Sequence, residues 1–312
     1  MRILLTGAGG QVGAEFLRAA AGLGEITATT RAECDLSDPA AIRRAVRSVR
    51  PDIIVNAAAY TAVDKAESEP EACFSVNAIA PGLLAEEAQT LGALLVHYST
   101  DYVFDGSKPS PYTEDDLPCP LGEYGRSKLE GERRILRSGA RALILRTSWV
   151  YGARGKNFLL TILRLARQRP ELRIVADQVG SPTSAREIAT ATVRILESRL
   201  GGPKDALSGA VSGDFFSGIY HMTAGGVTSW FGFARAIVDQ AGLASAPEVV
   251  AITTAEYPTP ARRPANSALS NHKFASAFGF RLRPWEEALA DVMREVRQSA
   301  PDRQASAAGA KG

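Results

Sequence analysis

Three side chains between residues 99 and 128 could together donate a proton. Thr100 closes an apolar run, and Tyr124 and Lys128 follow it after a polar loop. Because Tyr124 and Lys128 are four residues apart, a helix places both on one face, one turn apart. A neighbouring cation lowers the pKa of a phenol, and the Thr100 hydroxyl can hydrogen-bond to the same oxygen. This arrangement predicts a proton donor for a carbonyl group that is being reduced. The Tyr–Lys spacing alone is common on exposed helix faces, so its weight here comes from the Ser-Thr-Asp triplet before it.

A glycine-rich turn near the N-terminus could hold the phosphates of a dinucleotide. The stretch TGAGGQVG at residues 6–13 follows a short apolar run and precedes a helical pattern. Gly7 and Gly10 allow a tight turn and close approach of the backbone to a pyrophosphate, and Gly13 allows the helix to pack closely on the strand. The helix N-terminus adds free N–H groups and positive dipole charge. The position of the turn, one strand into an alternating pattern, favours a dinucleotide site over an ordinary turn.

The end of the second apolar run bears on which nicotinamide cofactor is preferred. A carboxylate there would bind the ribose hydroxyls of NAD and repel a 2′-phosphate. The run instead ends in Thr30, followed by Arg31, whose guanidinium can pair with a phosphate. We therefore expect NADPH, with NADH as the alternative; the simpler interpretation of Arg31 is an exposed surface charge. Asp35 and Leu36 lie slightly further along and could hold the adenine edge.

The order of the apolar runs predicts the scaffold around these residues. Runs of strand length alternate with helical periodicity, and they are continuously apolar, which is typical of a parallel sheet covered on both faces. The expected strands are residues 3–6, 26–30, 52–56, 94–99 and 142–147. The expected fold class is α/β, a Rossmann-type doubly wound parallel sheet with a smaller C-terminal α/β substrate domain.

The regular alternation loosens after residue 147, which sets the expected division of the chain. We expect a dinucleotide-binding domain over residues 1–147. A mainly substrate-binding domain is expected over residues 148–300, partly interleaved with the sheet. Residues 201–214 are predicted to be an exposed connector, because Gly, Ser and Asp recur there. Residues 301–312 are predicted to form a disordered tail.

Composition limits the classes of function. The 312 residues carry 36 basic and 34 acidic side chains, a net charge of +2 that gives no long-range attraction to nucleic acid or anionic membranes. The three cysteines lack metal-ligand spacing and suit a reducing compartment better than a disulfide framework. No apolar run reaches the ~20 residues that a membrane span needs. We therefore expect a cytoplasmic protein with no nucleic-acid or membrane partner.

Several longer motifs resemble those of a known enzyme family. The chain is similar to the extended short-chain dehydrogenase/reductases, which use a Thr/Ser–Tyr–Lys constellation, and more narrowly to the family of dTDP-4-dehydrorhamnose reductases. The matching stretches are GGQVG, VNAAAYTAVDKAESEP, HYSTDYVFDG, YGRSKLEGE, RTSWVYG, GKNF and YPTPARRPANS. The resemblance implies NAD(P)H-dependent reduction of the C4 ketone of a dTDP-sugar, dTDP-4-dehydro-6-deoxy-L-mannose, to dTDP-L-rhamnose.

The resemblance also implies roles for the residues that could react or hold the cofactor. Tyr124 would donate the proton, Lys128 would lower its pKa and contact the nicotinamide ribose, and Thr100 would tune the phenol. Residue chemistry and resemblance together give the expected cofactor-binding set: Gly7, Gly10, Gln11, Val12, Gly13, Thr30, Arg31, Asp35, Leu36, Ala57, Ala58, Ala59, Tyr124 and Lys128.

A second set of residues is implied for the substrate. Thr100 and Asp101 would lie against the sugar, and Trp149 would face it. Arg262 and Arg263 would pair with the nucleotide diphosphate, which explains how a nearly neutral protein could bind a dianion.

The sequence constrains metal binding and subunit assembly less than it constrains the fold. Some members of the family dimerise around Mg²⁺ held by glutamates, and Glu15 and Glu295 fall at suitable positions. Arg186 stands where a third acid would be expected. We therefore expect no metal site, with both glutamates as ordinary charges on helix surfaces, and a homodimer stays open. The histidines are expected to be structural residues: His97, His221 and His272.

Two other functions stay open at this point. One is a nucleotide-sugar dehydratase or epimerase; dehydration needs an added acid, commonly a Glu after the Thr-Asp pair, but here Tyr102 follows Asp101. The other is a non-catalytic NADP-binding regulatory subunit that resembles the methionine adenosyltransferase β subunit. The intact RTSWVYG stretch, which contains Trp149, favours the enzyme.

Overall fold

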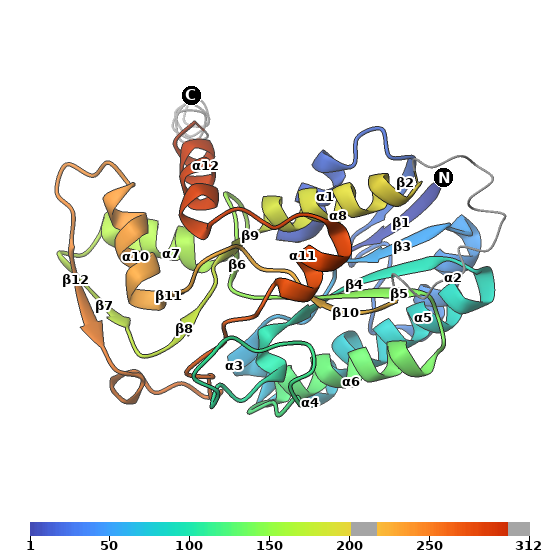
Figure 1. Ribbon diagram of the computed structural model, residues 1–312, viewed down its shortest axis with the longest axis horizontal. Helices are drawn as coiled ribbons and strands as arrows, with labels where there is room; N and C mark the ends of the chain where they lie inside the picture. Colours follow the sequence, from blue (N-terminus) through green and yellow to red (C-terminus); the bar gives the residue numbers. More distant parts are fainter. Residues whose placement is uncertain (201–216, 299–312) are drawn as a thin grey trace, which may run out of the picture.

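A six-stranded parallel sheet forms the centre of the computed structural model, which describes residues 1–200 and 217–298 (Figure 1). The strand order is β10-β5-β4-β3-β1-β2, and every neighbouring pair is parallel. The expected α/β class is confirmed, and the five expected strands are all present. The strands of this sheet are β1 Arg2–Thr6, β2 Glu25–Thr29, β3 Ile53–Asn56, β4 Leu94–Thr100, β5 Ala142–Thr147 and β10 Gly218–His221.

Helices α2 Pro39–Val49, α5 Ala80–Leu91 and α6 Glu123–Arg137 cover one face of the sheet (Figure 1). Helix α2 begins after Asp38, which accepts a hydrogen bond from the Ala40 N–H at 2.8 Å, and a proline occupies the first helical position. The core under these helices is apolar and fully buried at its centre. This face carries the helix that contains the proposed proton donor.

The opposite face is covered by α1 Gln11–Ala19, α8 Ala185–Leu200 and α11 His272–Phe278. Two of these helices, and β10 at the sheet edge, come from the second half of the sequence. Phe16, Ile188 and Phe274 are fully buried in the shared core. The C-terminal half therefore returns to the sheet rather than folding entirely beside it.

A second lobe has its own core and lies beside the sheet (Figure 1). Its helices are α7 Phe158–Ala166, α10 Trp230–Asp239 and α12 Trp285–Gln298. Strand β7 Glu171–Val175 pairs in parallel with β12 Glu248–Ile252. Four two-residue strands complete it: β6 Val150–Tyr151, β8 Val179–Gly180, β9 Thr183–Ser184 and β11 Thr228–Ser229.

The sequence of residues 70–91 has a continuous helical pattern, but the structure divides this stretch. A π-helical turn, η1 Ser75–Ile79, separates α4 Pro70–Phe74 from α5. Helix α6 approaches this turn so closely that a Cβ on Gly131 would lie 2.2 Å from the Asn77 carbonyl oxygen. The buried Asn77 side chain donates to the Tyr60 carbonyl and to the Ser127 hydroxyl. Tertiary contacts, which local periodicity does not report, set this interruption.

Other short elements complete the described chain, and two predictions fall outside it. The short elements are α3 Val63–Ala66, η2 Asp101–Val103 and η3 Thr254–Glu256. The expected connector over residues 201–214 and the expected tail over residues 301–312 lie outside the described residues. Among the helices that are described, none is long and apolar enough to cross a bilayer.

Candidate active site

The carboxyl ends of the central strands open into a cleft of roughly 840 Å³. Parallel sheets bind ligands at this edge, where the strand order reverses. Most of the site residues expected from the sequence line it: Gly7, Gly10, Gln11, Val12, Thr30, Arg31, Asp35, Leu36, Ala57, Ala58, Ala59, Thr100, Asp101, Tyr124, Lys128 and Trp149. Gly13, Arg262 and Arg263 are the expected residues that do not.

The glycine-rich turn forms a cradle at the start of α1. Gly7 has a φ of +75°, and a Cβ there would lie 2.6 Å from the Ala58 nitrogen, so the position requires glycine. Gly10 caps the helix without any side-chain hydrogen bond to its first turn. Gly13 is buried, with its would-be Cβ 2.2 Å from the Gly7 carbonyl oxygen, and therefore serves helix packing. Free N–H groups beside a bare backbone fit a pyrophosphate.

The tip of β2 presents an accessible guanidinium and a carboxylate that the sequence reasoning missed. The Arg31 side chain is 84% exposed and lies 3.3 Å from Asp35. Glu33 accepts a hydrogen bond from the Thr30 N–H at 2.6 Å, and this backbone bond lowers the pKa of Glu33. Glu33 lies in the turn after the strand, three residues beyond Thr30, and only the fold of this turn brings its carboxylate to the strand end.

Tyr124 and Thr100 meet at the floor of the cleft. Tyr124 comes from the first turn of α6, and Thr100 is the last residue of β4. Enclosure of the Tyr124 hydroxyl raises its pKa, and a hydrogen bond with Thr100 opposes that rise. The Tyr102 ring packs edge-to-face on Tyr124 at 5.6 Å between centroids. At neutral pH the phenol therefore keeps its proton.

Lys128 is directed beneath Tyr124 into the sheet. Its Nζ donates to the Tyr98 carbonyl oxygen at 2.6 Å and lies 3.1 Å from Nε2 of His97. The side chain is 2% exposed, and burial lowers the pKa of Lys128 to about 8. Desolvation, which raises the pKa of Tyr124, is the largest influence on that pKa in the structure; the lowering expected from Lys128 stays a prediction.

Asp101, a buried carboxyl group, follows Thr100 and also lines the cleft. Thr100 donates a hydrogen bond to its Oδ1 at 3.0 Å, and its Oδ2 has no hydrogen-bond partner in the part of the chain that the structure describes. Burial raises the pKa of Asp101 to about 7, although the hydroxyl groups of Ser267 and Thr100 oppose the rise. An unpartnered carboxyl oxygen at a cleft can accept or donate a hydrogen bond to a polar ligand.

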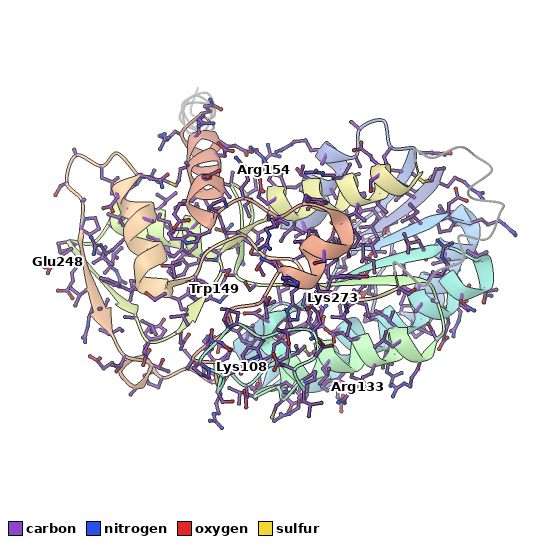
Figure 2. All side chains as sticks on the ribbon, viewed as in Figure 1. Lys108, Arg133, Trp149, Arg154, Glu248 and Lys273 are labelled. Carbon is purple, nitrogen blue, oxygen red and sulfur yellow. The ribbon has the colours of Figure 1, made fainter. Side chains whose placement is uncertain are left out.

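Two stacked tryptophans form the wall toward the second lobe. Trp149, which Figure 2 labels at the junction of the lobes, has a φ of +48° and donates from Nε1 to the Ser267 hydroxyl at 3.1 Å. The Trp230 ring stacks on it at 3.5 Å with an interplanar angle of 4°. Trp230 and Lys156 line the cleft but were not among the expected site residues. Lys156 lies in the GKNF motif, which was a usable signal, whereas Trp230 carries no local signal.

The two arginines expected at a diphosphate lie away from this wall. Arg263 pairs with Asp64 at 2.8 Å and also donates to Thr259. Its guanidinium lies near the Tyr102 phenol, whose pKa it lowers against the larger effect of burial. Arg262 is exposed. The structure therefore places Arg263 beside the Tyr102 phenol, and neither arginine is among the residues that line the cleft.

Glu15 and Glu295, expected as ordinary charges on helix surfaces, share the arginine partners Arg18 and Arg186. Arg186 pairs with Glu295 and lies 3.8 Å from Glu15, and Arg18 pairs with Glu15 at 3.0 Å. Within residues 1–200 and 217–298, no group of His, Cys, Asp and Glu side chains is arranged to hold a metal ion. The carboxylates are neutralised by guanidinium groups of the same chain.

Comparison with known proteins adds relatives that match over nearly the whole chain. A model of the family described as RmlD substrate binding domain matches residues 1–298. The chain is 50% identical over 302 residues to the dTDP-4-dehydrorhamnose reductase of Burkholderia thailandensis, covering 95% of this chain and 99% of the relative.

Solved structures agree with this match. A dTDP-4-dehydrorhamnose reductase from Clostridium acetobutylicum superposes with a TM-score of 0.87 at 35% identity, covering 95% of this chain and 100% of that chain. A second, from Bacillus anthracis in complex with NADP, gives a TM-score of 0.85 at 33% identity, with 94% and 99% covered.

Proposed function

The chain belongs to the RmlD substrate binding domain family, and from this premise we propose that it reduces dTDP-4-dehydro-6-deoxy-L-mannose to dTDP-L-rhamnose. The enzyme is an NADPH-dependent dTDP-4-dehydrorhamnose reductase, and the resemblance found in the sequence motifs is confirmed. The substrate is a dTDP-sugar, and its C4 ketone is the group reduced.

The observation that carries the proposal is a single constellation in one cleft. The glycine cradle, the phenol of Tyr124 and the Trp149 wall all line the same space. A cofactor on the cradle and a sugar against Trp149 would therefore meet beside Tyr124. This juxtaposition supports a reductase rather than a protein that only binds nucleotide.

The chain contributes binding, orientation and a proton. NADPH, when bound, supplies a hydride to the carbonyl carbon. The N-terminus of α1 would hold the pyrophosphate, and Arg31 would pair with the 2′-phosphate. Tyr124 stays protonated at neutral pH because its hydroxyl is enclosed, and it would donate that proton to the carbonyl oxygen. Thr100 hydrogen-bonds to the phenol and orients it.

The identity of Tyr102 separates this reaction from dehydration. Tyr102 follows Asp101 at the position where dehydration commonly uses a Glu, so the added carboxyl group that dehydration needs is missing there. Asp101 would contact the sugar hydroxyls, and Trp149 its apolar face. Arg262 and Arg263 stay proposed contacts of the diphosphate; because Arg263 pairs with Asp64, it would have to leave that partner.

Three further proposals concern the whole protein. We propose that residues 1–147 bind the dinucleotide and that residues 148–300 mainly bind the substrate. We propose a cytoplasmic location, which suits three unpaired cysteines, Cys34, Cys73 and Cys119. A homodimer is the proposed assembly, and sedimentation of the purified chain would distinguish it from a monomer.

The direct test is NADPH oxidation with enzymatically generated dTDP-4-dehydro-6-deoxy-L-mannose. The proposal predicts substrate-dependent loss of NADPH absorbance and equimolar formation of dTDP-L-rhamnose. Retention of a tightly bound NAD with no net oxidation would instead support an epimerase or dehydratase, and tight binding to another enzyme without turnover would support a regulatory subunit.

A further inference from the structure

A buried ion pair joins α6 to β5 close to the reacting position. Arg146 donates to the two carboxylate oxygens of Glu132 at 2.9 and 2.6 Å, and the two side chains are 2% and 1% exposed. Neither is among the described residues that line the cleft. Removing two charges from water costs about as much free energy as their attraction returns, so stability alone does not explain such a pair. Its bidentate geometry does fix the distance and angle between the two groups.

The carboxylate of Glu132 also holds the strand that carries Thr100. The Ser99 hydroxyl donates to Oε1 of Glu132 at 2.5 Å, and Ser99 on β4 is in register with Arg146 on β5. Residues in register on neighbouring strands point to the same face of the sheet, here the face that α6 covers. One carboxylate therefore ties the helix to two strands at their carboxyl ends, since Thr100 and Thr147 are the last residues of β4 and β5.

The helix and the strand joined in this way bring together the phenol and its hydroxyl partner. On α6, Tyr124, Lys128 and Glu132 are spaced four residues apart, so they lie on one face in successive turns. On β4, Ser99 directly precedes Thr100, whose hydroxyl is hydrogen-bonded to Tyr124. A rotation or slide of α6 on the sheet would therefore change the distance between the hydroxyl groups of Tyr124 and Thr100.

The neighbours of the ion pair are consistent with a charged carboxylate and guanidinium at this place. Nε2 of His221 lies 3.5 Å from Arg146, and this ring is neutral at pH 7 because burial and Arg146 lower its pKa to about 3. The guanidinium lies 5.1 Å from the centroid of the Phe104 ring. On the helix side, Glu132 raises the pKa of Lys128 against the larger effect of burial, so the same carboxylate favours the ammonium form of Lys128.

We propose that Glu132 and Arg146 are positioning residues of the reductase. Their ion pair, joined by the Ser99 hydroxyl, holds α6 against the ends of β4 and β5. This placement lets the Tyr124 phenol meet the Thr100 hydroxyl. The inference rests on the proposed function and deepens it, because it names the contact that places the proton donor.

The first test removes both charges and fills their space with apolar side chains. Replacing a buried ion pair by apolar residues of similar volume often leaves a protein at least as stable, so the double variant Glu132→Leu, Arg146→Met is expected to fold. Its kcat for NADPH oxidation with dTDP-4-dehydro-6-deoxy-L-mannose should fall by about 10- to 100-fold, as a displacement of about 1 Å can cause. The KM values should stay nearly unchanged, because neither residue lines the cleft. A folded double variant with an unchanged kcat overturns the proposal, because a purely structural pair would change only the melting temperature.

The second test separates the geometry of the pair from its charge. Arg146→Lys keeps a positive charge opposite Glu132, so no buried carboxylate is left unpaired, but an ammonium group lacks the planar fork of a guanidinium. A smaller displacement and a fall in kcat of about tenfold are expected, again with nearly unchanged KM values. The natural kcat in this variant would overturn the proposal, whether or not the double variant folds.

The matched control makes the same substitution in an ion pair on the outer side of the same helix. Arg134 pairs with Glu130 at 3.0 Å, and its side chain is 43% exposed. Arg134→Lys should leave kcat unchanged, because this pair does not join α6 to β4 or β5. An equal fall in kcat for Arg134→Lys and Arg146→Lys would also overturn the proposal.

The third test needs no turnover. In crystal structures of the cofactor-free double variant and of Arg146→Lys, the hydroxyl groups of Tyr124 and Thr100 should lie more than about 3.5 Å apart, beyond hydrogen-bond distance. A retained hydrogen bond between them in both variants overturns the proposal. This measurement contains neither cofactor nor substrate, so its failure is distinguishable from failure of the proposed function, which would show as absence of NADPH oxidation by the natural chain.

Discussion

Burial controls the protonation of three side chains around the reacting position. Tyr124 keeps its proton, Asp101 has a pKa of about 7, and Lys128 has a pKa of about 8. Each is shifted toward its uncharged form, as desolvation requires. The reacting position therefore presents an uncharged phenol to a charged cofactor.

The carboxyl group of Asp101 gives a stability prediction with a definite sign. Its pKa is about 7 when folded, against an ordinary value of 3.8, so between these pH values the folded state binds more protons than the unfolded state. Stability from this group is therefore fully present below about pH 4 and is lost as the pH rises through about 7. Asp101→Asn should raise the melting temperature more at pH 8 than at pH 5. An equal gain at both pH values would contradict the shift.

Arg31 should determine the cofactor preference. Its side chain is exposed, and a charge-assisted bond to a phosphate is worth ~1.5–3 kcal/mol, so Arg31→Ala should raise the KM for NADPH by about ten- to a hundred-fold and leave that for NADH nearly unchanged. Arg44 is a matched control, because it is an exposed arginine, 70% accessible, that does not line the cleft. Equal losses for both cofactors would count against the 2′-phosphate role.

At the scale of elements, α6 positions both Tyr124 and Lys128, and it does so through a close approach to the π-helical turn η1. Gly131 and Asn77 form the contact, and Ser127 is hydrogen-bonded to Asn77 at 3.1 Å. The sequence predicted the Tyr–Lys spacing on one helix. It did not predict η1, because a continuous helical pattern spans residues 70–91 and only the packing of α6 interrupts it.

The glycine at this contact provides a stability test for the element. A Cβ at Gly131 would clash with backbone, which cannot yield as a flexible side chain can, so Gly131→Ala should destabilise the protein by roughly 1–3 kcal/mol in denaturant unfolding, despite its better helix propensity. Gly9→Ala is the control, since its Cβ would meet nothing within 4 Å. A Gly131→Ala variant as stable as the control would show that the close approach is dispensable.

For the whole molecule, periodicity predicted the sheet, because parallel strands buried on both faces are continuously apolar. The motif residues between Gly7 and Trp149 could then be expected at one site, because the carboxyl ends of parallel strands meet at one edge of the sheet. Trp230 was missed, because the second lobe brings it to the cleft.

The proposed reaction depends most directly on the phenol of Tyr124, and one measurement tests that role. NADPH oxidation with dTDP-4-dehydro-6-deoxy-L-mannose should fall by about 10²- to 10⁴-fold in Tyr124→Phe, the usual range for loss of a general acid. Binding of NADPH to the same variant should be nearly unchanged, and Tyr102→Phe should serve as the control with a much smaller loss. Near-full turnover in Tyr124→Phe, with the cofactor bound normally, would contradict the account.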